Sequence, residues 1–120
     1  MIKLSLDEGY VFDILSILHV KMKKASNDNL NKVSSSFKAM EIEIISQIGE
    51  KKYAEVISSQ EYNNLFKANE KTFNLVDKVK QDNGLAKEVD DANYERYLCK
   101  IDLQKKFFNN QISEIKIGYK

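Results

Sequence analysis

Apolar residues recur every three or four positions along most of the chain, the spacing that places side chains on one face of an α-helix. The pattern predicts four main helices, at residues 7–24, between a turn at 25–29 and residue 48, at 59–80, and from 86 to 109 or 110. Residues 50–58 carry only three apolar anchors, Tyr53, Val56 and Ile57, and are expected to be less regular. Both the first and the third helix are expected to start with a capping box, formed by Ser5 with Glu8 and by Ser58 with Glu61.

Both ends of the chain show a different period. Near the start, Ile2, Leu4 and Leu6 alternate with polar residues, and near the end the same alternation runs through Ile115, Ile117 and Tyr119. Alternation of this kind is typical of short strands. The predicted fold class is therefore all-α: an up-and-down bundle of four main helices with short N- and C-terminal strands, whose pairing would bring the termini together.

Composition supports one helical domain over residues 1–120, because the chain has no proline and four glycines. A net charge of +1, with acids and bases interspersed, favours neither nucleic acid nor an anionic membrane as a partner. The single Cys99 and the single His19 exclude an intramolecular disulfide and leave no set of metal ligands, so no metal or cofactor is expected. We expect neither a transmembrane helix nor a signal peptide, and the natural setting is the reducing cytoplasm.

Arg96 is the only arginine of a chain with eighteen lysines. Asn93, Arg96 and Lys100 follow one another at spacings of three and four, so a helix displays them on one stripe. A guanidinium is a planar fork of donors suited to a carboxylate or phosphate, and lysine replaces it poorly. The spacing indicates a row of polar side chains, which we call the polar ladder. It either bonds to polar residues of other helices or binds a small anion.

Polar residues on two other predicted helices offer partners for this ladder. Asn69 interrupts the apolar line Leu65, Phe66, Phe73 and Val76, while Asp13, Glu70 and Asp77 supply carboxylates. The simpler interpretation is a clasp between helices, in which Arg96 finds a buried carboxylate. The alternative is a small-anion pocket in which Arg96 and Lys100 hold a phosphate or carboxylate, and Asn69 and Asn93 orient it.

The same positions carry a resemblance. The segment 5–21, which contains Gly9, Asp13, a Ser-Ile-Leu run and Lys21, resembles the opening of an uncharacterised family of small helical proteins from bacteria and phages. Residues 65–77 and the Asn-Tyr-Glu-Arg run at 93–96 with Lys100 are similar to later parts of that family, whereas Phe73, Tyr94 and Tyr97 depart from it. The resemblance implies a helical fold, no assigned reaction, and a shared cluster of Asp13, Lys21, Asn69, Asp77, Asn93, Arg96 and Lys100.

The sequence does not favour an enzyme, because its candidate catalytic residues suit other roles. His19 falls near the exposed side of its predicted helix, and Cys99 suits a small core position better than a nucleophile. The aromatic residues Tyr10, Tyr94, Tyr97, Phe107 and Phe108 exceed what the core needs, which predicts self-association as a homodimer. The sequence thus favours a non-catalytic helical interaction or structural protein, and it does not identify a protein partner. The alternative is a small-anion binding module centred on Arg96 and Lys100.

Overall fold

The protein is all-helical, as predicted. A computed structural model describes residue 2, residues 4–82 and residues 86–109. Its elements are α1 (Glu8–Lys24), α2 (Asn27–Ile48), α3 (Glu50–Ile57), α4 (Gln60–Asp82) and α5 (Ala86–Phe108). None of the helices within these ranges has the length and apolar character needed to cross a membrane.

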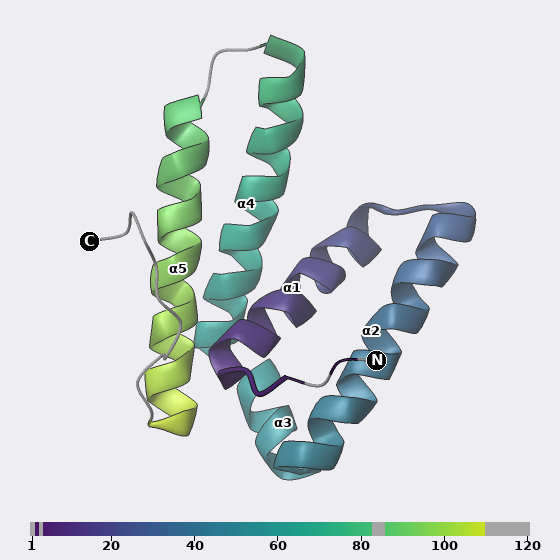
Figure 1. Ribbon diagram of the computed structural model, residues 1–120. Coiled ribbons are helices and arrows are strands. Elements are labelled where there is room, and N and C mark those ends of the chain that lie inside the picture. Colours follow the sequence, from purple (N-terminus) through teal and green to yellow (C-terminus); the bar gives the residue numbers. More distant parts are fainter. Residues whose placement is uncertain (1, 3, 83–85, 110–120) are drawn as a thin grey trace.

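Three of the described helices, α2, α4 and α5, pack against α1. The long helices α4 and α5 lie side by side, and α1 runs obliquely across this pair while α2 folds back along α1 (Figure 1). The short α3 links α2 to α4 and contacts both. The core forms where these helices meet, from Phe12, Leu15, Ile44, Tyr53, Val56, Tyr62, Leu65 and Leu103.

The segment expected to be irregular is a helix of its own. Gly49, with φ 91°, ends α2 and starts α3 in a backbone conformation that favours glycine. Tyr53 and Val56, two of its three predicted anchors, are buried. Tyr53 Oη also donates a hydrogen bond of 2.7 Å to Glu41 Oε2 on α2. The described chain therefore has five helices rather than four main ones, because side chains of an eight-residue segment reach the core.

The predicted capping residues are each displaced. The N-cap of α1 is Asp7, which makes no side-chain cap bond, so the Ser5–Glu8 capping box is wrong. Ser59, not Ser58, caps α4, because its Oγ accepts a hydrogen bond of 3.0 Å from the backbone N–H of Tyr62. Ser58 instead donates back to the carbonyl of Ala54 at the end of α3.

A residue of α5 takes over the capping of α1. The buried Gln104 accepts a hydrogen bond from the backbone N–H of Gly9 and donates one of 2.9 Å to Glu8 Oε1. A Cβ at position 9 would lie 2.9 Å from the carbonyl oxygen of Lys100 and 3.1 Å from Gln104 Oε1. Glycine is therefore required here for close approach of the two helices, and this contact fixes the start of α1 against α5.

Several expected apolar positions lie at the surface. Val76 of α4, which belongs to the predicted apolar line, is 37% exposed, and Leu30 of α2, an apolar residue of another predicted helix, is exposed to the same extent. Leu30 lies in the first turn of α2 and Val76 in the last two turns of α4. Periodicity marks the apolar face of a helix but not how far along that face a neighbour reaches.

The predicted N-terminal strand is not seen among the described residues. In the described part of the N-terminal segment, Ile2, Leu4, Ser5 and Leu6 belong to no regular element and are exposed. The C-terminal strand through Ile115, Ile117 and Tyr119 lies outside the described residues.

Candidate functional site

A buried carboxylate lies where α1, α4 and α5 meet. Asp13 of α1 is only 7% exposed. Its Oδ2 accepts a charge-assisted hydrogen bond of 3.3 Å from Nη2 of Arg96 on α5. Nη1 of the same guanidinium donates to Asn93 Oδ1, one turn earlier on α5, at 3.0 Å. The predicted spacing of Asn93 and Arg96 thus produces a direct contact, and Asn93 orients the guanidinium toward α1.

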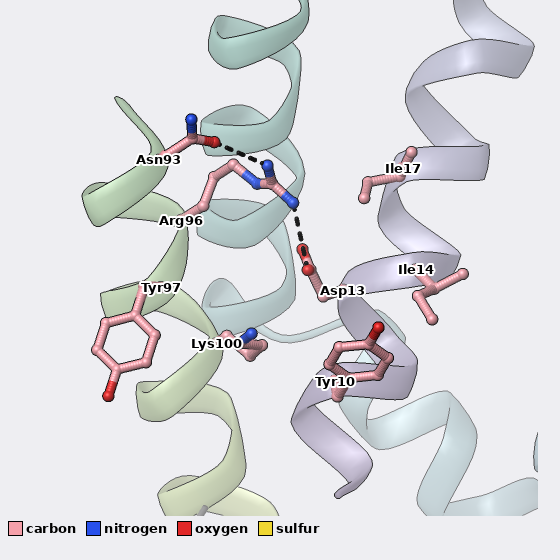
Figure 2. A pocket seen from close by; sticks show the side chains of 8 residues that line it. All are labelled: Tyr10, Asp13, Ile14, Ile17, Asn93, Arg96, Tyr97 and Lys100. Carbon is pink, nitrogen blue, oxygen red and sulfur yellow. Dashed lines mark hydrogen bonds and ion pairs between the residues drawn. The ribbon is translucent and has the colours of Figure 1, made fainter. Parts of the chain in front are cut away.

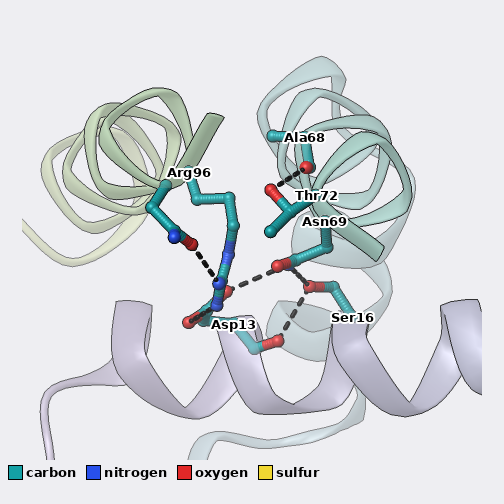
Figure 3. A network of polar contacts seen from close by, with 7 residues as sticks. Asp13, Ser16, Ala68, Asn69, Thr72 and Arg96 are labelled. Carbon is teal, nitrogen blue, oxygen red and sulfur yellow. Dashed lines mark hydrogen bonds and ion pairs between the residues drawn. The ribbon is translucent and has the colours of Figure 1, made fainter. Parts of the chain in front are cut away.

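Asn69 brings α4 into the same network (Figure 3). Its Nδ2 donates to Asp13 Oδ1 at 3.0 Å and also to Ser16 Oγ. Ser16 Oγ in turn donates to the backbone carbonyl of Asp13 at 2.8 Å. Asn69 is 4% exposed, so the amide that interrupts the apolar line of α4 is buried as the sequence indicated.

The network pairs the Asp13 carboxylate with one positive charge and adds a hydrogen bond from an amide. A carboxylate removed from water is costly unless it is paired and hydrogen-bonded. Here Arg96 and Asn69 each engage a different oxygen of Asp13. Three helices are tied to one carboxylate, which is the geometry expected for an inter-helix clasp.

Arg96 nevertheless has donor capacity that the protein does not use. Its Nε is buried and has no hydrogen-bond partner in the described structure. Its contact with Asp13 is a single bond rather than the bidentate pair that a guanidinium can make. Buried donors are nearly always satisfied, so an unused one calls for an explanation.

A cavity of about 290 Å³ lies beside the clasp, between α1 and α5 (Figure 2). Arg96 and Lys100 bring positive charge to its lining, and Asp13 brings negative charge. Lys100 is 4% exposed, and its Nζ lies 5.3 Å from the ring centre of Tyr10 and 5.9 Å from that of Tyr97. Contacts of this kind with aromatic faces favour an ammonium group. The complete lining consists of Tyr10, Asp13, Ile14, Ile17, Asn93, Arg96, Tyr97 and Lys100.

Two of the seven predicted site residues lie elsewhere. Lys21 and Asp77 are exposed and take no part in the network around Asp13. Each follows a network residue of its own helix by eight positions, Lys21 after Asp13 and Asp77 after Asn69. Eight positions correspond to roughly 80° of rotation and about 12 Å of rise. The structure therefore brings Asp13, Asn69, Asn93, Arg96 and Lys100 together and leaves the other two on the surface.

Other members of the site were not singled out from the sequence as ligand-binding candidates. Ser16 follows Asp13 by three residues on the buried face of α1, a spacing that signals a shared environment. Tyr10 and Ile17 line the cavity only because α1 lies against α5, and no local pattern shows this. Thr72 is buried close to Asn69, but its hydroxyl bonds to the carbonyl of Ala68 within its own helix (Figure 3).

His19 is not the surface residue that the sequence suggested. Its ring lies 5.4 Å from that of Phe37 and 4.7 Å from that of Phe66, measured between ring centres, and its Nδ1 is 3.2 Å from Tyr62 Oη. Burial lowers the pKa of His19 and raises the pKa of Tyr62. The pKa of the Cys99 thiol is raised, chiefly by burial, which disfavours the thiolate that a nucleophile needs.

A second cavity, of about 470 Å³, lies between α1, α2 and the N-terminal segment. Leu6, Val11, Met40 and Ile44 give it an apolar lining, and Glu8 and Glu43 are its charged residues. None of its described lining residues is a cation. The α1–α5 cavity is therefore the better candidate for an anion.

Comparisons with family models, with curated proteins and with solved structures give no match. Within the described ranges, no group of three or more His, Cys, Asp or Glu side chains is placed to hold a metal ion. The resemblance to an uncharacterised bacterial and phage family stays a prediction.

Proposed function

We propose that the protein is a non-catalytic helical binding protein that takes a small anion in the α1–α5 cavity. The observation that carries the proposal is that the Arg96 guanidinium lines a cavity of about 290 Å³ and makes one bond to Asp13 rather than the bidentate pair it can form. A carboxylate or phosphate oxygen is the acceptor that a guanidinium binds best.

The neighbours of Arg96 support the same ligand class. Lys100 adds a second positive charge to the cavity lining, and Asn93 adds an amide one turn before Arg96. Asp13, itself a lining residue, accepts a hydrogen bond from Nη2 of the guanidinium, so the fork is already oriented before a ligand arrives. Pre-ordering of this kind reduces the entropy lost on binding. The clasp and the anion site are then two uses of one residue.

The test is thermal unfolding at constant ionic strength with acetate, phosphate and benzoate. A ligand at ten times its Kd stabilises the folded state by about 1.4 kcal/mol, which for a domain of this size corresponds to roughly 4–7 °C. We expect at least one of these anions to shift the native protein saturably. Arg96→Lys keeps the charge but removes the donor fork, and it should lose most of that shift.

Lys105→Arg is the matched control, because Lys105 is an exposed cation on the same helix. It should respond as the native protein does. Equal responses in all three proteins would show a general salt effect and refute the site, as would a native protein that no anion stabilises. If Arg96→Lys fails to fold by circular dichroism, Lys100→Met takes its place.

Self-association as a homodimer remains a separate proposal with a narrower basis. Phe108 stacks on Phe12, and Nζ of Lys52 lies 5.6 Å from the ring centre of Phe107. Both adjacent phenylalanines therefore have partners within one chain. Tyr94, at 43% exposed, and Leu98, at 42%, still present apolar surface on α5. Light scattering that gives the mass of a single chain at high concentration would contradict this proposal.

Pairing of the terminal segments is likewise our proposal for residues 2–6 and 115–119. Hydrogen exchange tests it, because paired strands protect alternate backbone amides in both segments. Unprotected amides throughout both segments would refute it.

A further inference from the structure

The cavity between α1 and α5 has two chemically different sides. The cations Arg96 and Lys100 project from α5, whereas α1 contributes two isoleucines, Ile14 and Ile17, beside the Asp13 carboxylate (Figure 2). Neither isoleucine can satisfy any part of an inorganic anion. A ligand that fills the cavity must therefore bring apolar surface as well as charge.

Asp13 restricts the charge of the ligand. Its carboxylate is fixed in the lining by Arg96 and Asn69, so an entering anion meets a negative charge close to the guanidinium. The three charged residues of the lining, Asp13, Arg96 and Lys100, sum to one positive charge. A monoanion balances that charge, whereas a dianion leaves a negative charge in the cavity that nothing pairs. The lining thus matches a carboxylate better than phosphate, which carries more than one charge at neutral pH.

The size of the cavity limits the apolar part. Its volume of about 290 Å³ falls at the lower end of small-molecule sites, which span about 300–1,000 Å³. A single ring or a short branched chain fits this range, whereas a long acyl chain or a nucleotide does not.

From these three properties we infer that the cavity takes a monocarboxylate carrying a compact apolar body, such as one aromatic ring. The inference rests on the proposed function and specifies its ligand class. The carboxylate lies at Arg96 and Lys100, and the apolar body lies against Ile14 and Ile17.

Calorimetric titration of the full chain with three probes tests the inference. Benzoate has both the charge and the ring, phosphate has charge alone, and benzyl alcohol has the ring alone. At constant ionic strength we expect benzoate to bind about tenfold or more tightly than either of the others. Phosphate lacks the apolar burial, of which even two or three methylene equivalents account for such a factor, and benzyl alcohol lacks the charge that a guanidinium binds.

A pair of isoleucine variants locates the apolar contact. Ile17→Ala removes apolar lining and should weaken benzoate by about threefold or more. The same substitution at Ile42, an isoleucine of α2 that is 62% exposed, should leave benzoate binding unchanged. Benzoate should also shift the methyl resonances of Ile14 and Ile17 more than that of Ile42.

The outcomes separate this inference from the proposed function. Phosphate that binds as tightly as benzoate, and still depends on Arg96, overturns the ligand class but leaves the anion site intact. Benzyl alcohol that equals benzoate shows an apolar cavity in which charge is irrelevant, and it overturns both. Absence of binding by all three probes also overturns both. Equal losses in the Ile17 and Ile42 variants remove the apolar contact from the cavity.

Discussion

Gly9→Ala tests how α1 docks on α5, because two effects of the substitution have opposite signs. Alanine favours a helix over glycine by about 1 kcal/mol, so the substitution stabilises α1 if nothing else lies nearby. In the structure, however, the new methyl group would lie 2.9 Å from the carbonyl oxygen of Lys100 and 3.1 Å from Gln104 Oε1. The first of these atoms is backbone and cannot swing away.

The magnitude follows from the contacts that must change. Overfilling a packed site costs about 1–3 kcal/mol. Moving α1 outward also weakens the hydrogen bond from the Gly9 amide to Gln104, which contributes about 1 kcal/mol. After the gain in helix propensity, we expect the free energy of unfolding to fall by about 1–3 kcal/mol.

Urea titration at 25 °C, followed by circular dichroism, measures this change. Ser35→Ala is the control, because Ser35 is exposed on α2 and reports the propensity of alanine without a clash. It should be neutral or slightly stabilising. A stabilised Gly9→Ala protein would show that α1 does not approach α5 this closely, and the lining of the cavity would then have to be reconsidered.

Two further predictions concern polar residues of the interior. Arg96→Met leaves Asp13 with only Asn69 as a side-chain partner, so we expect the free energy of unfolding to fall by about 1–3 kcal/mol. The loss is smaller than for a fully buried pair because the Arg96 side chain is 25% exposed. A urea titration that shows no loss would contradict the clasp. Burial lowers the pKa of His19. Below about pH 6.5 the unfolded chain therefore binds more protons at this residue than the folded chain does. The contribution of neutral His19 to stability is complete above that pH and should fall as the pH drops toward the folded-state pKa. His19→Gln should show less of this fall in urea titrations at pH 7.5 and 5.5, and parallel curves would refute it.

The sequence predicted the helical class because its apolar period is strong and proline is absent. It did not predict α3 as a helix, since a segment of eight residues gives barely two turns in which to recognise a period. The burial of Tyr53 and Val56 in this segment could be predicted, because removing a large apolar side chain from water is favourable in any backbone conformation. The local capping rules placed two caps wrongly. At α1, Gln104 of a distant helix bonds to the start of the helix in place of a nearby serine, and at α4 the cap is the next serine along the chain, Ser59.

Polar residues of the site were visible from the sequence for different reasons. Asn69 stood out because it interrupts an apolar line, and Arg96 because the chain has no other arginine. The cavity was not visible, since it depends on the separation of α1 from α5. His19 was misjudged for the same reason, because Phe37 and Phe66, which surround it, come from α2 and α4.

Gly9 and Arg96 control different properties of the same helix contact. Gly9 sets how closely α1 approaches α5, and α1 carries Asp13 and Ile17 to the cavity. Arg96 supplies charge and donors from α5 without setting that spacing. Gly9→Ala should therefore disturb stability and the response to anions together, whereas Arg96→Lys should remove the response while retaining much of the pairing with Asp13. If Arg96→Lys instead loses as much stability as Gly9→Ala, and both variants respond to anions as the native protein does, this position holds a clasp and no binding site.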